Sequence, residues 1–164
     1  MKNKIPVEKN KEYTVKISAV SSDGNGIAHI DGYTLFIPNS VTDDELRVLV
    51  VKVKSGYGYA KILEIITPSP DRITPLCPVF AQCGGCSFSH VAYPTQLKLK
   101  KNFVFDALTR IGGLKDFSVS DVIGADNPFR YRNKMVFPFG VDKNGEIVFG
   151  FFRQRSHNII PLCD

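Results

Sequence analysis

The stretch GIAHIDGYTLFIP, residues Gly26 to Pro38, contains two short runs rich in Ile and Tyr on either side of the turn signal DGY. The same pattern continues on both sides, with EYTVKISAV before it and ELRVLVVKVKSG and YAKILEII after it. Such runs, bounded by Asp and Gly, predict β-strands. Five short strands within residues 1–67 predict a small closed barrel, and an OB-like barrel is the usual fold at that size. OB-like barrels often bind oligonucleotides, whereas the alternatives are an SH3-like barrel that binds protein and a spacer without a ligand.

The composition of the whole chain is that of an ordinary globular protein. It has 164 residues, enough for one medium or two small domains, with 43% hydrophobic and 23% charged residues. No apolar run is long enough to span a bilayer, and the start MKNKIPVEKNKEYTVKI lacks the apolar segment of a secretory signal. We therefore expect a cytoplasmic protein with no membrane partner. Its net charge of +5 is compatible with a polyanionic partner.

A change in composition near residue 68 divides the chain. The stretch TPSPDRITPLCP, residues Thr67 to Pro78, holds four prolines and predicts an extended, stiff connector. Of the twelve phenylalanines only Phe36 precedes it, and the net charge rises from +1 in residues 1–67 to +4 in residues 68–164. The prediction is an α+β protein in which a five-stranded OB-like barrel, residues 1–67, precedes a mixed α/β region, residues 68–164.

The second region is expected to contain one helix and one β-hairpin. The stretch PTQLKLKKNFVFDALTRIGG predicts a helix with Pro94 in its first turn and Gly112-Gly113 at its end. Apolar residues at helical spacing, from Leu97 to Ile111, predict one face directed to a core. Further on, KMVFPFGV and EIVFGFF flank DKNG, which is a strong hairpin signal. Pro138 within the first run indicates an edge or bulged strand.

Three of the four cysteines, Cys77, Cys83 and Cys86, lie within ten residues in CPVFAQCGGCSFSH. A C-x2-C pair lets two thiolates reach one ion or cluster from a single turn, and the glycines between them permit unusual backbone angles. In a reducing compartment such spacing favours a metal site. The less favoured alternatives are disulfides, buried apolar cysteines and a thioredoxin-like redox pair. Three thiolates need a fourth ligand. Cys163 would suit iron–sulfur or zinc, and His90 would suit zinc.

Two later segments interleave basic and aromatic side chains: NPFRYRNKMVF, residues 127–137, and GFFRQRSHN, residues 150–158. In a strand, Arg130, Arg132 and Lys134 would project to one face, and Arg153 and Arg155 alternate likewise. The hairpin would bring the two segments side by side as one surface for an anionic ligand. Arginine suits phosphate and aromatic faces stack on unpaired bases, whereas a solvated basic sheet face is the alternative interpretation.

The segments CGGCSFSHVAYPTQLKLKK, NPFRYRNKMVFPFG and GFFRQRSHNIIPLCD resemble the RNA (uracil-5-)-methyltransferase family, and DGNGIAHIDGYTLFIPNSVTDDELRV resembles its N-terminal TRAM domain. The resemblance runs from about Glu12 to Asp164. It implies that the TRAM barrel and the strand carrying Arg130, Arg132 and Lys134 bind RNA. Ribosomal RNA is the expected substrate. The resemblance further implies a [4Fe-4S] cluster, with His90 beside the site. The expected ligands are Cys77, Cys83, Cys86 and Cys163.

The chain also departs from this family, whose members continue into an S-adenosylmethionine-binding domain, because it stops one residue after Cys163. Methylation at C5 of uracil needs a cysteine thiolate that adds at C6, a carboxylate base and a cofactor pocket. All four cysteines are assigned to the cluster, and IGGLKD is a poor cofactor loop because it follows a helix. We therefore expect no catalytic residues in this chain, and a monomer that binds RNA but neither binds S-adenosylmethionine nor methylates alone.

Two other function classes are compatible with the residues. One is a stand-alone RNA-binding module with a structural zinc or iron–sulfur site. The other is an electron carrier or redox sensor. An electron carrier is disfavoured because the cluster would link residue 77 to residue 163. Closing so long a loop is typical of a metal site with a structural role.

Overall fold

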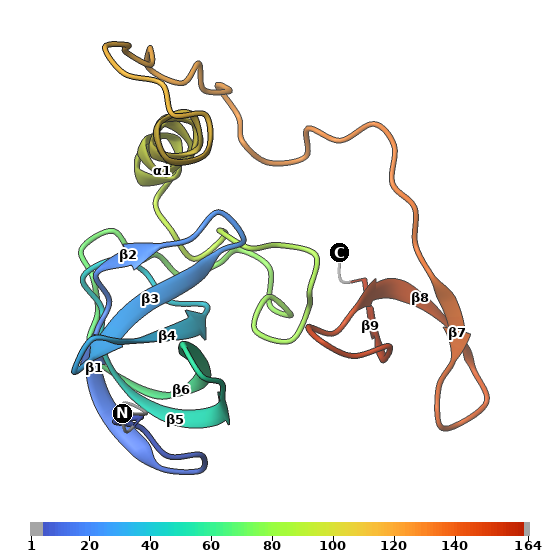
Figure 1. Ribbon diagram of the computed structural model, residues 1–164. Coiled ribbons are helices and arrows are strands. Elements are labelled where there is room, and N and C mark those ends of the chain that lie inside the picture. Colours follow the sequence, from blue (N-terminus) through green and yellow to red (C-terminus); the bar gives the residue numbers. More distant parts are fainter. Residues whose placement is uncertain (1–4, 163–164) are drawn as a thin grey trace. The chain divides into compact units, whose positions relative to one another are not determined.

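The computed structural model describes residues 5–162, and the first of these form a curled six-stranded sheet (Figure 1). The strand order is β1-β5-β6-β4-β3-β2, with β4 and β6 parallel and the other neighbours antiparallel. The strands are β1 (Glu12–Lys16), β2 (Ala19–Val20), β3 (Asn25–Ile30), β4 (Tyr33–Pro38), β5 (Glu45–Val53) and β6 (Tyr57–Thr67).

The sheet is closed because β1 and β2 are two halves of one extended run. Before the bend, β1 pairs with β5, and after it β2 pairs with β3. At the bend, the N–H of Ile17 donates to the carbonyl of Asp44 and the N–H of Ser18 donates to that of Ile27, each at 2.9 Å. One run therefore serves both edges of the sheet. This closure confirms the predicted OB-like barrel, whose first predicted strand is the bent one.

Alternation within the strands sends one set of side chains into the barrel. In β4, Tyr33, Leu35 and Ile37 are buried, while the residues between them are half-buried on the outer face. The core gathers the inward positions of all the long strands, so removing apolar surface from water is the main force that closes the sheet. Its fully buried members include Ile17, Ala28, Leu35, Ile37, Leu46, Val48 and Val50.

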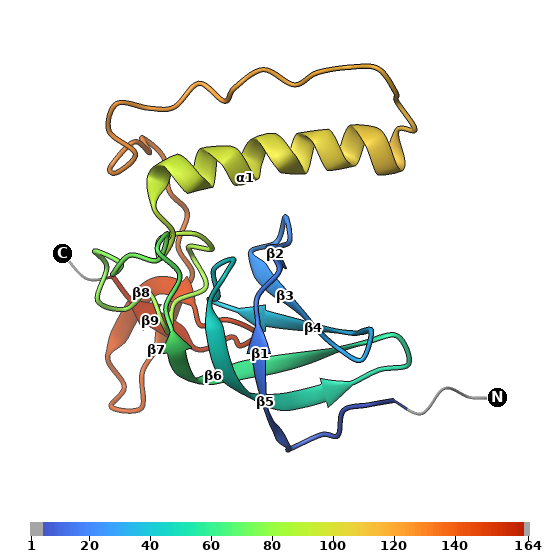
Figure 2. The same cartoon turned by 90° about the vertical axis from the view of Figure 1, so that its left-hand side faces the viewer.

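The predicted helix is present as α1 (Tyr93–Asp106), followed by one π-helical turn, Ala107–Ile111. Proline stands in its first turn, and the helical run stops at Gly112, before Gly113 takes a φ of 66°. Figure 2 shows α1 lengthwise, with an extended segment after it. The expectation of a core-facing stripe is wrong for the described chain, because no residue of α1 or of the π-helical turn is buried and Ile111 is 88% exposed.

A separate three-stranded sheet of β7 (Phe139–Val141), β8 (Ile147–Phe152) and β9 (Ile159–Pro161) contains the predicted hairpin. Its turn is held by Asp142, whose carboxylate accepts from the N–H groups of Asn144 and Glu146, and Gly145 supplies a φ of 86°. β7 begins directly after Pro138 and is an edge strand. The strand predicted for residues 127–137 is absent from the described structure.

Close contacts divide the chain into two units: residues 1–73 with 90–123, and residues 74–89 with 124–164. The cysteine segment therefore groups with the three-stranded sheet, although the residues on both sides of it group with the barrel. Within the described residues, no helix combines the length and the apolar character that crossing a bilayer requires.

The fully buried carboxylate of Asp44 fastens the connector to the barrel. It accepts hydrogen bonds from the N–H of Val41 at 2.6 Å and of Ser69 at 2.9 Å, and pairs with the guanidinium of Arg72. Arg72 also donates to the carbonyl of Asn39 at 2.9 Å. Burial alone would raise the pKa of Asp44, but the hydrogen bonds from Arg72, Ser69 and Val41 outweigh it and hold the pKa below its ordinary value.

The same place closes the base of the cysteine segment. The N–H of Ile73 donates to the carbonyl of His90 at 3.0 Å, and the N–H of Ala92 donates to that of Asp71 at 2.8 Å. Arg72 and Val91 form the bridge between these two bonds. Residues 74–89 are thus an excursion whose two ends are paired beside a buried ion pair.

Replacing Asp44 by Asn tests this anchor. The charge that pairs with Arg72 is lost, so we expect the free energy of unfolding at pH 7 to fall by about 2 kcal/mol. A carboxyl whose pKa is lower in the folded state stabilises above its unfolded pKa and loses that contribution as pH falls through the folded value. The difference between Asp44→Asn and wild type should therefore shrink below about pH 4.

Urea unfolding at pH 7 and below about pH 4 measures the free energy of unfolding of both proteins. The chain has no tryptophan, and five of its six tyrosines, all but Tyr131, precede residue 94, so tyrosine emission reports chiefly on the barrel unit. Asp43→Asn is the matched control, because Asp43 pairs with Lys16 on the exposed surface and such pairs contribute little. Equal losses for the two variants would contradict the anchor.

Candidate functional site

The cysteine segment, residues 74–89, is folded into tight turns. The N–H of Phe80 donates to the carbonyl of Cys77 at 3.2 Å, and the N–H of Cys83 donates to that of Val79 at 2.9 Å. Phe80 is buried and anchors the turn, while Cys77 and Cys86 are exposed and Cys83 is half-buried. The turn therefore places thiols at the surface of a fixed loop, where they are accessible as ligands.

The end of β8 seats this loop within the same unit. The N–H of Gly84 donates to the carbonyl of Phe152 at 2.9 Å, and Cys83 forms an antiparallel bridge with Arg153. The guanidinium of Arg153 donates to the amide oxygen of Gln82 at 2.6 Å. The sequence suggested Arg153 as a ligand contact, and the structure gives its guanidinium a partner within the chain.

The two glycines of the C-x2-C pair are explained by this seat and not by unusual backbone angles. Neither has a positive φ. A Cβ on Gly84 would lie 2.8 Å from the carbonyl oxygen of Phe152, and one on Gly85 would lie 3.1 Å from the ring of Phe151. The Phe151 ring in turn meets that of Phe137 edge-on, with centroids 5.1 Å apart. The glycines therefore let the loop lie close to β8 and to the aromatic rings of Phe151 and Phe137.

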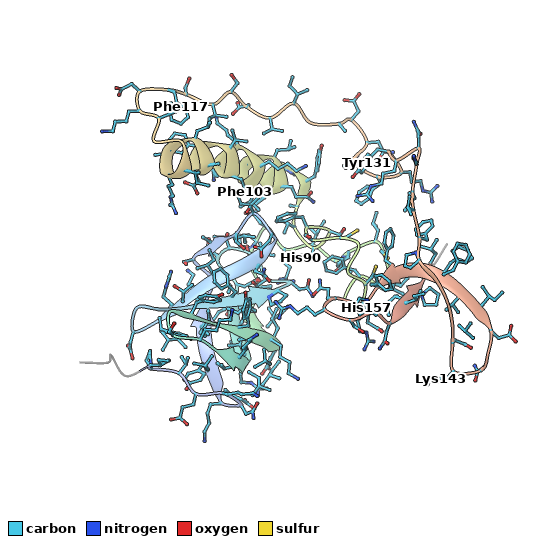
Figure 3. All side chains as sticks on the ribbon, turned by 45° about the vertical axis from the view of Figure 1, so that its right-hand side comes forward. His90, Phe103, Phe117, Tyr131, Lys143 and His157 are labelled. Carbon is cyan, nitrogen blue, oxygen red and sulfur yellow. The ribbon has the colours of Figure 1, made fainter. Side chains whose placement is uncertain are left out.

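The two candidates for a fourth ligand differ in their surroundings. Cys163 lies outside the described residues, beyond the end of β9. His90 is buried in the barrel unit, and its Nε2 lies 3.2 Å from the carbonyl oxygen of Ser40 (Figure 3). Burial lowers the pKa of His90 and favours the neutral ring.

The described residues, 5–162, contain no group of three His, Cys, Asp or Glu side chains that could hold one metal ion. A four-iron cluster bound by four cysteines has a separate iron for each thiolate, so its ligands stand farther apart than those around a single ion. Three thiols on one seated loop have the donor chemistry that such a cluster needs.

The basic segment around Arg132 differs from its predicted form. Arg130 has a φ of 56°, which breaks the strand alternation expected to align it with Arg132 and Lys134. All three are exposed, and none of them has an ion-pair partner among the described residues. Tyr131, labelled in Figure 3, is 68% exposed, with the guanidinium of Arg132 5.8 Å from its ring centroid. Arg155 also has a positive φ of 58°.

An aromatic cluster on the outer face of the barrel was missed by the sequence analysis. The rings of Phe36, Tyr57 and Tyr59 have centroids 5.7 to 5.8 Å apart in all three pairs. The parallel pairing of β4 with β6 places Phe36 opposite Tyr59. The available signal was the alternation of tyrosine and glycine in YGY, but the pairing that adds Phe36 comes from elements far apart in sequence.

Three exposed lysines belong to the same outer face. The ammonium of Lys54 donates to the hydroxyl of Tyr57 at 2.9 Å, Lys52 pairs in register with Tyr59, and Lys61 follows Tyr59 by two residues on β6. The hydrogen bond from Lys54 is the main cause of a lowered pKa at Tyr57. We call the rings of Phe36, Tyr57 and Tyr59 with Lys52, Lys54 and Lys61 the barrel patch.

Replacing Gly84 by Ala tests the seat of the cysteine loop. Its Cβ would require the backbone of Phe152 or of the loop to move, so we expect a loss of about 1–3 kcal/mol in the stability of this unit. Amide hydrogen exchange read at residues 150–160 measures it. Gly56→Ala is the control, since a Cβ there meets nothing within 4 Å. Unchanged exchange in Gly84→Ala would contradict the close approach.

Known proteins resemble this chain in sequence and in fold. Residues 6–63 match the TRAM domain. An uncharacterized RNA methyltransferase of Clostridium tetani is 43% identical over 162 residues, covering 99% of this chain and 35% of the relative. Another from Halalkalibacterium halodurans is 45% identical over 161 residues, covering 98% of this chain and 35% of the relative. The chain thus spans about a third of the length of these relatives.

A solved structure shares the fold. The tRNA (uracil-54, C5)-methyltransferase of Pyrococcus abyssi, in complex with S-adenosyl-L-homocysteine, superposes with a TM-score of 0.56 at 23% identity. The match covers 92% of this chain and 31% of that one. It extends beyond the barrel and therefore includes most of the second region.

Proposed function

We propose that the chain, which aligns over 99% of its length with about a third of an RNA methyltransferase, is the RNA-binding part of an S-adenosylmethionine-dependent RNA (uracil-5-)-methyltransferase. The observation that carries this proposal is the presence, in one stretch aligned to RNA methyltransferases, of both a TRAM domain and the seated cysteine loop. We further propose ribosomal RNA as the substrate and a monomer as the working form.

The exposed cations around Arg132 are proposed to hold the RNA backbone. Arg130, Arg132 and Lys134 have no partner carboxylate among the described residues, so their charges are available to phosphates. Arginine matches phosphate through two parallel N–H groups, and the exposed ring of Tyr131 offers a face to an unpaired base. Arg155 would add one charge, while Arg153 contributes chiefly to the seat of the cysteine loop through Gln82.

The cysteine loop is proposed to hold a [4Fe-4S] cluster with Cys77, Cys83, Cys86 and Cys163 as ligands. Support comes from three thiols on a loop that β8 holds in place through the backbone of Gly84. When bound, the cluster would cross-link this loop to the end of the chain, which is a structural role. The alternative is one zinc ion, for which His90 would have to give up its place beside Ser40 if it were a ligand.

The chain by itself is proposed to bind RNA without methylating it. Uracil C5 becomes nucleophilic only after a thiolate has added at C6, and a base must then remove the C5 proton. If all four cysteines are cluster ligands, none is left for that attack. The other two thirds of the relatives' length would supply the nucleophile, the base and the cofactor pocket.

Salt dependence tests the RNA-binding proposal. We expect the logarithm of the affinity for single-stranded RNA to fall linearly with that of salt, and Arg132→Ala to reduce the slope by about 0.7. Fluorescence anisotropy of a labelled RNA over a range of salt measures it. Lys143→Ala is the matched control, because it removes one charge at the hairpin tip of the same unit (Figure 3). Binding without salt dependence, or none at low salt, would contradict the proposal.

Metal and sulfide analysis tests the cluster. Chain purified without oxygen should contain about four irons and four sulfides, and Cys86→Ser should lose most of both. Ser87→Ala, one residue further along the same loop, should keep them. One zinc without sulfide would overturn the cluster and leave a zinc-bound module.

A further inference from the structure

The barrel patch has the composition of a nucleic-acid contact, although it lies on the barrel and not among the basic segments of the second region. Phe36 and Tyr59 of the patch alternate with buried residues. Leu35 and Ile37 flank Phe36, and Gly58 and Ala60 flank Tyr59, all on the inner side. The barrel core therefore fixes which way the three rings point, and each ring remains half-buried on the outside.

The three rings are arranged so that they do not stack on one another. Tyr57 stands at 84° to Phe36 and at 80° to Tyr59, in edge-to-face contact with both. Phe36 and Tyr59 are tilted by 37°. An edge-to-face contact covers a face of only one ring of the pair, whereas a parallel stack covers a face of both. A flat, unpaired base can therefore add to the cluster by stacking.

A fixed turn sets the position of Lys54 beside these rings. The N–H of Lys54 donates to the carbonyl of Tyr57 at 2.9 Å, and its carbonyl accepts from the hydroxyl of the buried Tyr33 at 2.7 Å. The hydrogen bond to Tyr57 is the first cause of a raised pKa at Lys54, whose ammonium is charged at neutral pH in any case. A positive charge is thus held at the edge of the aromatic surface.

The charges around the rings are of one sign. In the described part of the chain, neither Lys52 nor Lys61 has an ion-pair partner. The exposed ion pairs of the barrel lie elsewhere, where Glu12 and Glu64 hold Arg47 and Asp43 holds Lys16. Aromatic pairs alone would be explained by strand stabilisation. Lysines without ion-pair partners beside half-buried aromatic rings fit an occupant that is both flat and anionic.

We propose that the barrel patch binds one unpaired nucleotide of single-stranded RNA, with its base stacked on the Phe36, Tyr57 and Tyr59 cluster and its phosphates held by Lys54 and its neighbours. This inference rests on the proposed function and adds a binding site that is independent of the basic segment around Arg132. Base–aromatic stacking is tolerant of sequence, so the site positions RNA without selecting a base.

The test compares two probes of about ten nucleotides, an oligouridine and the matching abasic oligonucleotide, on the full chain. Tyr57→Leu should raise the Kd for oligouridine about tenfold and leave that for the abasic strand within about twofold. Tyr57→Phe keeps the ring and should keep the affinity. Lys54→Ala should weaken both probes alike, because it acts on phosphate.

Two controls separate recognition from folding. Tyr13→Leu truncates a barrel tyrosine that packs against the core, and Lys16→Ala removes a charge from β1. Neither should change the discrimination between the two probes. Because the chain has no tryptophan, quenching of tyrosine emission by oligouridine gives a second readout. It should be weaker in Tyr57→Leu than in Tyr13→Leu.

The outcomes distinguish failure of this stacking site from failure of the proposed RNA-binding function. Equal loss of both probes in Tyr57→Leu, no loss, or a loss as large in Tyr57→Phe overturns the stacking site, while a normal effect of Arg132→Ala leaves RNA binding intact. Quenching by a proline-rich peptide in place of oligouridine would assign the patch to a protein partner and overturn the inference. Failure of the wild-type chain to bind RNA at low salt overturns both.

Discussion

The buried carboxylate of Asp44 joins two parts of the chain that are distant in sequence, the turn at residues 39–44 and the connector at residues 69–72. It binds the turn at Val41, the connector at Ser69 and the guanidinium of Arg72, and Arg72 reaches on to the carbonyl of Asn39. A buried charge without a partner is costly, so this arrangement permits only conformations in which the connector lies against the barrel. The connector is therefore held in a fixed position against the barrel at Ser69 and Arg72.

That anchor explains how a loop can be presented for chemistry. Residues 71–73 and 90–92 pair directly beside Arg72, so the excursion that carries the cysteines leaves and returns at one place. Between these two ends, Cys83 and Gly84 hold the loop against the end of β8. Fixing both ends and the middle of a short loop lowers the entropy that metal binding must overcome. The proposed cluster would add a covalent link to a loop that is already ordered.

Much of the fold followed from local sequence patterns. Alternation in YTLFIP and ELRVLVVKV predicted the barrel strands, Pro94 and Gly112 bounded the helix, and Asn144-Gly145 predicted the hairpin. The absent strand and the missed contacts share one cause. Alternation in FRYRNK predicted a strand, but a strand also needs a hydrogen-bonding neighbour, and none is present in the described structure. The Asp44–Arg72 pair and the meeting of Phe36 with Tyr59 depend on partners distant in sequence, which no local pattern specifies.

The account places RNA on two surfaces of one chain, the barrel patch and the basic segment around Arg132. Ultraviolet cross-linking of oligouridine to the full chain, followed by mass spectrometry of the linked peptides, tests this most directly, because it locates contacts without any substitution. The account predicts cross-links in β4 or β6, at Phe36, Tyr57 or Tyr59, together with cross-links at Tyr131 or its neighbours. Cross-links confined to β1 and α1, or none at low salt, would contradict it.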